Sequence, residues 1–133
     1  MLATAACLMI VYETDHGGSI RDRMAEMASH DCAYAITADR CASACTFYLD
    51  PDRLACVARD TVFMFHGPVA RPGDPPITPE EFDELTRLIA SHYPPEIADP
   101  FLREWRHGEV EMLGQSIIDA GLAAECRWLG QVQ

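Results

Sequence analysis

The chain has 133 residues, 49% of them apolar, and its ten basic residues include no lysine. This length predicts one domain, spanning residues 1–133, with its own hydrophobic core, and no repeat or low-complexity tract divides it. The formal net charge of −11 argues against nucleic acid and anionic membranes as partners, because both would repel the protein. Without lysine, Schiff-base chemistry and serine–lysine dyads are excluded.

The cysteines and the N-terminus give opposite indications about the cellular compartment. Six cysteines in a small acidic domain favour an oxidising environment. The opening stretch "MLATAACLMIVYETD" has no basic residue at its start, so it is interpreted as a strand rather than a signal peptide, and no segment is long enough to span a membrane. The sequence therefore predicts a periplasmic protein if a signal precedes this chain, and a cytoplasmic one otherwise.

Four apolar stretches predict strands. The first, 6–13, is nearly continuous, which is typical of a strand buried on both faces. The other three stretches cover 32–37, 54–58 and 61–65. Because helices are predicted between and after them, the pattern indicates an α/β domain with a largely parallel sheet. In such sheets, sites form at the carboxyl ends of the strands.

Helices are predicted by their caps. Ser19, paired with Asp22, opens a helix over 20–30. Thr78, Pro79 and Glu81 supply the cap, the first-turn proline and the capping-box glutamate of a helix over 78–92.

Further helices are less strongly marked, and a loop separates them from the strands. They are expected over 42–49, over 93–108 with an interruption at Pro100, and over 114–122, with Gly121 as the C-cap. The stretch 67–78 is rich in proline and glycine and predicts a flexible loop.

Three features lie at predicted strand ends. Gly17 and Gly18 follow the first strand and let the backbone approach a ligand, although a tight turn would also use them. Ser43 stands at a predicted helix start, where it is either a nucleophile or an N-cap. His66 ends a hydrophobic strand, where an imidazole is either a general base or a hydrogen-bonded structural residue.

Taken in this order, the features resemble the Clp protease proteolytic subunit superfamily, which shares its fold with the crotonases. The resemblance runs from Ile10 to Pro68 and, more weakly, through 116–126. It is greatest to small bacterial Clp-protease-like proteins, often predicted to be periplasmic, that carry a cysteine-flanked serine. The implied fold is Clp-protease/crotonase-like, with room in this chain for fewer N-terminal strands than the peptidase subunits have.

The resemblance implies a serine hydrolase, most plausibly a peptidase, that uses no cofactor and no metal. Ser43 matches the nucleophile, His66 the general base, and the amides of Gly18 and Ala44 the oxyanion hole. The acid that orients the histidine falls in a region without clear alignment, and Glu104 is the candidate chosen. A peptide or protein substrate follows, and homo-oligomerisation is left open.

Two alternatives are weighed for the function and two for the cysteines. A non-catalytic interaction or scaffold domain would keep the fold, whereas an acyl-CoA enzyme is disfavoured because no basic patch is evident for the CoA phosphates. Cys41 and Cys45 are either buried small hydrophobes or partners in disulfides that pin the serine, for example with Cys56. The cysteine spacing does not match a zinc site.

Overall fold

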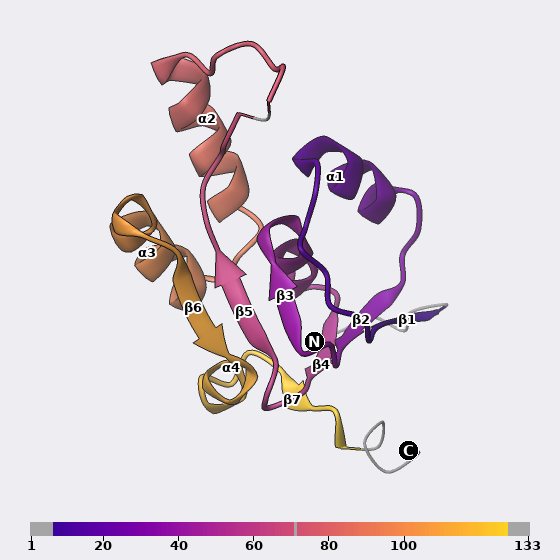
Figure 1. Cartoon of the computed structure of the whole chain (residues 1–133). Helices are drawn as coiled ribbons and strands as arrows, with labels where there is room; N and C mark the ends of the chain where they lie inside the picture. Colours follow the sequence, from indigo (N-terminus) through magenta and orange to yellow (C-terminus); the bar gives the residue numbers. More distant parts are fainter. Residues whose placement is uncertain (1–6, 71, 128–133) are drawn as a thin grey trace.

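The computed structural model describes residues 7–70 and 72–127 and shows a mixed α/β fold with two sheets (Figure 1). The first sheet is parallel, in the order β1-β2-β4-β7: β1 Leu8–Val11, β2 Ala33–Ile36, β4 Leu54–Val57 and β7 Ala124–Glu125. The second has the order β3-β5-β6: β3 Arg40–Ala42, β5 Val62–Phe65 and β6 Val110–Leu113. β3 and β5 run parallel, and β6 is antiparallel to β5. The predicted α/β class with a parallel sheet is confirmed.

The helices follow the strands in the order expected of an α/β chain. They are α1 Ile20–Ala28, the 3-10 helix η1 Ser43–Leu49, α2 Pro79–Ala90, α3 Pro95–Glu104, the 3-10 turn η2 Trp105–His107 and α4 Gly114–Asp119. Figure 1 shows α1 and α2 at the end of the molecule toward which β3 and β5 point, with α4 at the opposite end. The carboxyl ends of β3 and β5 therefore lie at the end of the molecule that carries α1 and α2.

The first strand differs from its prediction. β1 is an edge strand that pairs only with β2 among the described strands. Leu8 and Ile10 remain 40% and 39% exposed, and only Val11 is buried. The expectation of burial on both faces is therefore wrong for β1, because Leu8 and Ile10 point to the same face of the sheet and that face stays accessible to solvent. It holds for β2, in which every residue from Ala33 to Ile36 is buried.

The predicted helix caps are confirmed. Ser19 Oγ accepts a hydrogen bond from the Asp22 amide at 3.3 Å, and Thr78 Oγ1 accepts one from the Glu81 amide at 3.2 Å. Gly121 has φ 76° and ends α4, where its own amide and the next one bond back to carbonyls of the last turn. This pair of bonds is the Schellman arrangement, which needs the left-handed conformation that glycine adopts without strain.

Two helical details differ from the sequence prediction. α3 continues through Pro100 instead of breaking there. The carbonyl that loses its amide partner is that of Glu96, an exposed residue, so water can satisfy it. The helix expected over 42–49 is present as η1, but with 3-10 geometry, and it begins at Ser43. The described parts of loop 67–78 contain no helix or strand, and the predicted flexibility of this loop stays a prediction.

The six cysteines form three disulfides: Cys7–Cys32, Cys41–Cys45 and Cys56–Cys126. Disulfides are thus confirmed over free thiols, but the suggested bridge from Cys41 or Cys45 to Cys56 is wrong. Cys41 and Cys45 belong to the main core cluster, whereas Cys56 packs with Ala35 and Cys126 in a separate small cluster. Three disulfides indicate an oxidising environment.

Candidate active site

Ser43 occupies the turn between β3 and η1. It has φ 57° and is the only described residue other than glycine with a positive φ. This left-handed conformation is unfavourable for a residue with a Cβ, and it persists only where the surroundings enforce it. A serine on a sharp, strained strand-to-helix turn is the arrangement that exposes a nucleophilic hydroxyl in hydrolases.

A chain of hydrogen bonds stabilises the turn at Ser43. Thr46 Oγ1 donates to the Ser43 carbonyl at 2.6 Å, and it also contacts the Tyr93 hydroxyl. Because the single hydroxyl hydrogen of Thr46 is given to the carbonyl, Tyr93 must be the donor in the second bond. Burial raises the pKa of Tyr93, which keeps the phenol protonated for this role. Neither Thr46 nor Tyr93 is marked as a site residue by any pattern in the sequence.

The glycine pair lies directly against the serine turn. A Cβ built on Gly17, whose φ is 95°, would stand 2.5 Å from Ser43 Cβ and 2.8 Å from the Ala44 nitrogen. Any side chain at position 17 would therefore collide with Ser43 and with the Ala44 amide. Gly17 is therefore required here by close approach as well as by backbone conformation, and Gly18, with φ 125°, by backbone conformation.

A salt bridge fixes the loop that carries the glycines. The Asp15 carboxylate accepts a bond from the Gly17 amide at 2.8 Å and pairs with Arg23 Nη2 at 2.9 Å. The backbone of Asp15 also exchanges hydrogen bonds with Arg40 and Ala42 of β3. The loop after β1 is thus tied to both α1 and the strand that leads into Ser43. The local sequence does not predict this salt bridge, because Asp15 lies in the loop after β1 and Arg23 lies in α1.

Two amides are free to bind an anion beside Ser43. Ala44 lies in the first turn of η1, where amides have no partner within the helix. The Gly18 amide takes part in no backbone hydrogen bond with the residues that the structure describes. These are the two amides that the sequence predicts for an oxyanion hole, and both residues line one pocket with Ser43.

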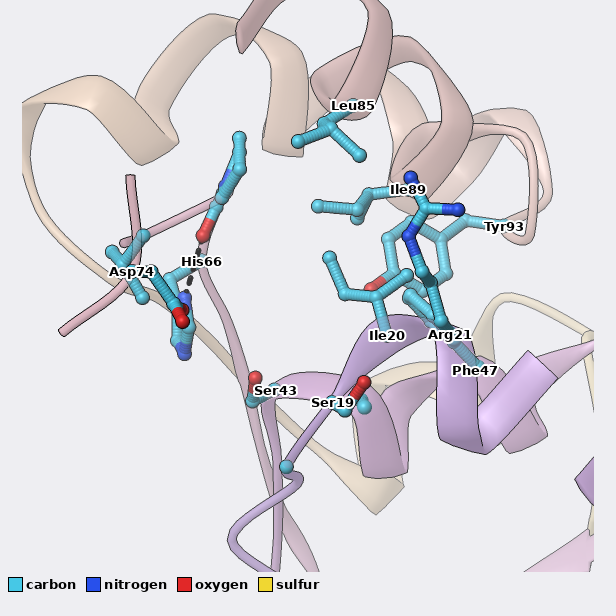
Figure 2. A pocket seen from close by; sticks show the side chains of 15 residues that line it. Ser19, Ile20, Arg21, Ser43, Phe47, His66, Asp74, Leu85, Ile89 and Tyr93 are labelled. Atoms are coloured by element: carbon cyan, nitrogen blue, oxygen red, sulfur yellow. Dashed lines mark hydrogen bonds between the residues drawn. The ribbon is translucent and has the colours of Figure 1, made fainter. Parts of the chain in front are cut away.

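His66 follows β5 directly and lines the same pocket, as Figure 2 shows. Its Nδ1 lies 2.8 Å from the Gly67 carbonyl oxygen. Since a carbonyl can only accept, Nδ1 carries the hydrogen, and Nε2 of the neutral ring has the free lone pair that a general base needs. The structure records no hydrogen bond between this ring and Ser43 Oγ. Such bonds are often long before substrate binds.

The pocket has a volume of about 380 Å³ and is lined by both polar and apolar side chains. In Figure 2, His66 and Asp74 lie on one side, Ser43 lies at the base, and a cluster of apolar side chains lies on the other side together with Arg21. The apolar side chains come from α1, η1 and α2 and from the segment after α2: Ile20, Phe47, Leu85, Ile89 and Tyr93. The arrangement can hold a group with an apolar side chain next to the serine hydroxyl.

Glu104, the predicted acid, is not brought to this pocket. It is exposed at the end of α3 and is absent from the pocket lining, and the Gly67 carbonyl occupies the position on His66 Nδ1 that an acid would take. The carboxylate that does line the pocket is Asp74, from the loop between β5 and α2. This loop carries no periodic pattern, so the sequence could not place Asp74 relative to His66.

A search of protein-family models and a search of curated proteins found no significant match to this chain. Across residues 7–70 and 72–127, no group of three or more histidine, cysteine, aspartate or glutamate side chains is arranged to hold a metal ion. In the same ranges, no helix has the length and apolar character needed to cross a membrane.

Proposed function

We propose that the protein is a serine hydrolase of the Clp-protease/crotonase-like fold, and most specifically a peptidase. The observation that carries this proposal is the left-handed turn at Ser43, which opens into the pocket that His66 and two free amides also line. A strained serine, a correctly protonated imidazole and two unbonded amides are the parts that acyl transfer to serine requires.

The reaction follows from these parts. Ser43 Oγ attacks the carbonyl carbon of the scissile bond while its proton passes to His66 Nε2. The amides of Gly18 and Ala44 donate to the oxygen that becomes negatively charged. His66 then gives the proton to the leaving amine. In the second half, His66 takes a proton from water, whose oxygen attacks the acyl-serine, and then gives this proton to Ser43 Oγ as the carboxylic acid is released.

The histidine in this proposal is oriented by the backbone. The Nδ1–H to Gly67 bond fixes the tautomer, as a carboxylate does in a triad. Gly67 is buried and packs closely against Trp105, since a Cβ at this position would stand 2.3 Å from the ring. The carbonyl is thus held in place by close packing, and Glu104 has no part in the mechanism.

The apolar side of the pocket supports a peptide or protein substrate that places an apolar side chain next to the scissile bond. The three disulfides support a location outside the reducing cytosol, which for a bacterial protein of this kind is the periplasm. Homo-oligomerisation remains open in this proposal.

The first experiment is covalent labelling with a fluorophosphonate probe, which reacts only with an activated serine. Ser43→Ala should abolish labelling, and His66→Ala should slow it by about 100-fold or more, because the general base is lost. Ser19→Ala is the matched control, since Ser19 lines the same pocket but caps α1, and it should label at the wild-type rate. Glu104→Gln should also label normally.

Two outcomes would contradict the proposal. Labelling that survives in Ser43→Ala would place the reactive group elsewhere. A folded wild-type protein that does not label would favour the non-catalytic interaction domain. The lack of a Ser43–His66 hydrogen bond in the structure is the observation that gives this second reading its weight.

A further inference from the structure

The Cys41–Cys45 disulfide spans the proposed nucleophile. Cys41 lies in β3 and Cys45 in η1, so the bond joins the strand to the helix across the turn that contains Ser43. Ser43 is at the centre of the crosslinked segment, two residues from each cysteine. Both cysteines are 0% exposed, and their Cα atoms are 5.3 Å apart.

The position of this disulfide coincides with the only strained non-glycine residue described. Ser43 has φ 57°, which an L-residue adopts only when its surroundings hold it there. A crosslink between the second residue before and the second residue after Ser43 removes most of the alternative backbone conformations of the turn. Without it, the Ser43 backbone can relax to a negative φ, and the hydroxyl then points in a different direction.

The other restraints on the turn act at different places. The Thr46 hydroxyl holds the Ser43 carbonyl, and the Asp15 backbone holds β3 through Arg40 and Ala42. These bonds fix the two ends of the turn, and none of them fixes the φ angle of Ser43. The disulfide is the restraint that joins the residues on both sides of Ser43 and so limits the backbone angles of Ser43 itself.

We propose that the Cys41–Cys45 disulfide is a positioning element for the nucleophile, which holds the Ser43 backbone in the conformation needed for attack. The inference rests on the proposed hydrolase function. It predicts that loss of this bond slows the chemical step while the binding of substrate in the pocket is unchanged. Because both sulfurs are buried, the bond acts as a permanent restraint in the folded protein and not as a switch.

The chain offers a matched control in Cys56–Cys126. This disulfide joins β4 to the residue after β7, and neither cysteine lines the pocket. Its cysteines are 70 residues apart, against 4 for Cys41–Cys45, so its removal should reduce stability more. A rate effect that follows general stability would therefore be larger in the control, and an effect of Ser43 geometry would be larger in the Cys41–Cys45 variant.

The experiment compares wild type, Cys41→Ala/Cys45→Ala and Cys56→Ala/Cys126→Ala by fluorophosphonate labelling over a range of probe concentrations. We expect the first variant to lower the limiting labelling rate by about tenfold or more, because a small displacement of a reacting atom is costly. The half-saturating probe concentration should change by less than about twofold. The control should keep both parameters within about twofold of wild type. Cys41→Val/Cys45→Ala, which fills the buried volume better, replaces the first variant if that variant does not fold.

A second measurement does not depend on activity. The backbone chemical shifts of Ser43 report its left-handed φ, and they should change in Cys41→Ala/Cys45→Ala but not in the control. Unchanged shifts, or a wild-type limiting rate in the first variant, would overturn the inference. If wild type itself does not label but the Ser43 shifts still move, the positioning role of the disulfide stands and the proposed function fails.

Discussion

His92 stacks on Phe47, a residue of the apolar pocket wall, with ring centroids 4.3 Å apart and an interplanar angle of 7°. Burial lowers the pKa of His92, and the nearby Asp50 opposes this effect without cancelling it. The folded protein therefore favours the neutral imidazole at this position. His92 thus links the pH of the solution to the packing of Phe47, which lines the pocket.

The stability of the protein should fall as the medium becomes acidic, in part through His92. Its pKa is lower in the folded than in the unfolded state, so unfolded chains bind more protons as the pH drops below the ordinary histidine pKa of about 6.5. His92→Phe keeps the stacking and should reduce the loss in free energy of unfolding between about pH 7.5 and about pH 5.5. Denaturant unfolding at several pH values measures this.

The exposed His107 supplies the control for that comparison. His107→Phe should leave the pH dependence of wild type in place. An equal slope in wild type and His92→Phe would show that the burial of His92 does not contribute.

At the residue scale, the sequence predicts which residues form the site better than it predicts the contacts that hold them in place. His66 ends a predicted strand and Ser43 starts a predicted helix, so a shared pocket at the carboxyl edge of the sheet could be expected, although β3, the strand that leads into Ser43, is not predicted. The left-handed conformation of Ser43 could not be expected, because it depends on the Cys41–Cys45 bond across the turn and on the close approach of Gly17. The failure of Glu104 to reach the pocket has the same origin: no periodic pattern relates α3 to β5.

At the element scale, α2 forms the wall of the pocket opposite His66 and begins where the loop 67–78 ends. Leu85 and Ile89 face the pocket from this helix, whereas Leu88 is exposed. The start of α2 is fixed by Thr78 Oγ1, which satisfies the Glu81 amide. The cap therefore also defines where the loop stops and the wall begins.

Removal of this cap should destabilise the protein by a modest amount. Thr78→Ala leaves the Glu81 amide without its partner, and such a change costs about 1 kcal/mol in the free energy of unfolding. Glu84→Ala, at an exposed position of α2 beyond the first turn and with no role in the cap, is the control. Urea denaturation with a constant m-value measures the difference. A loss of equal size in both variants would mean that the cap bond contributes nothing.

The elements that sequence reasoning missed are short and depend on distant partners. β3, β6 and β7 have three, four and two residues. Each exists because of pairing with a strand far away in the sequence, such as β7 with β4. The caps of α1 and α2, by contrast, depend on a side chain and an amide three residues apart, so the local sequence contains the whole signal.

At the scale of the whole molecule, one core cluster includes residues of both sheets and of all the longer helices. The disulfides are distributed over this architecture. Cys7–Cys32 joins the residues just before β1 and β2, and Cys56–Cys126 joins β4 to the chain beyond β7. The latter closes the longest segment and so restricts the unfolded chain most.

Removal of Cys56–Cys126 should reduce stability more than removal of Cys41–Cys45 does. For the labelling rate the order should be reversed. In the chain-entropy account, removal of Cys56–Cys126 costs about 4 kcal/mol in free energy of unfolding, and removal of Cys41–Cys45 costs about 2 kcal/mol. Thermal and denaturant unfolding of the two double-alanine variants measure this order. Mass analysis of the wild type with and without reductant checks the starting point, since each of the three disulfides takes up two hydrogens on reduction. A more stable Cys56→Ala/Cys126→Ala variant would contradict the predicted order.

The packing of Gly67 against Trp105 makes tryptophan fluorescence sensitive to changes in the pocket. The indole ring lies so close to Gly67 that no side chain fits between them, and Gly67 carries the carbonyl that His66 uses. A shift of the His66–Gly67 backbone on ligand binding must therefore alter the surroundings of the indole. In Trp128→Phe, which leaves Trp105 as the only tryptophan in the sequence, the emission of Trp105 can thus serve as a label-free reporter of pocket occupancy, with no dye attached to the chain.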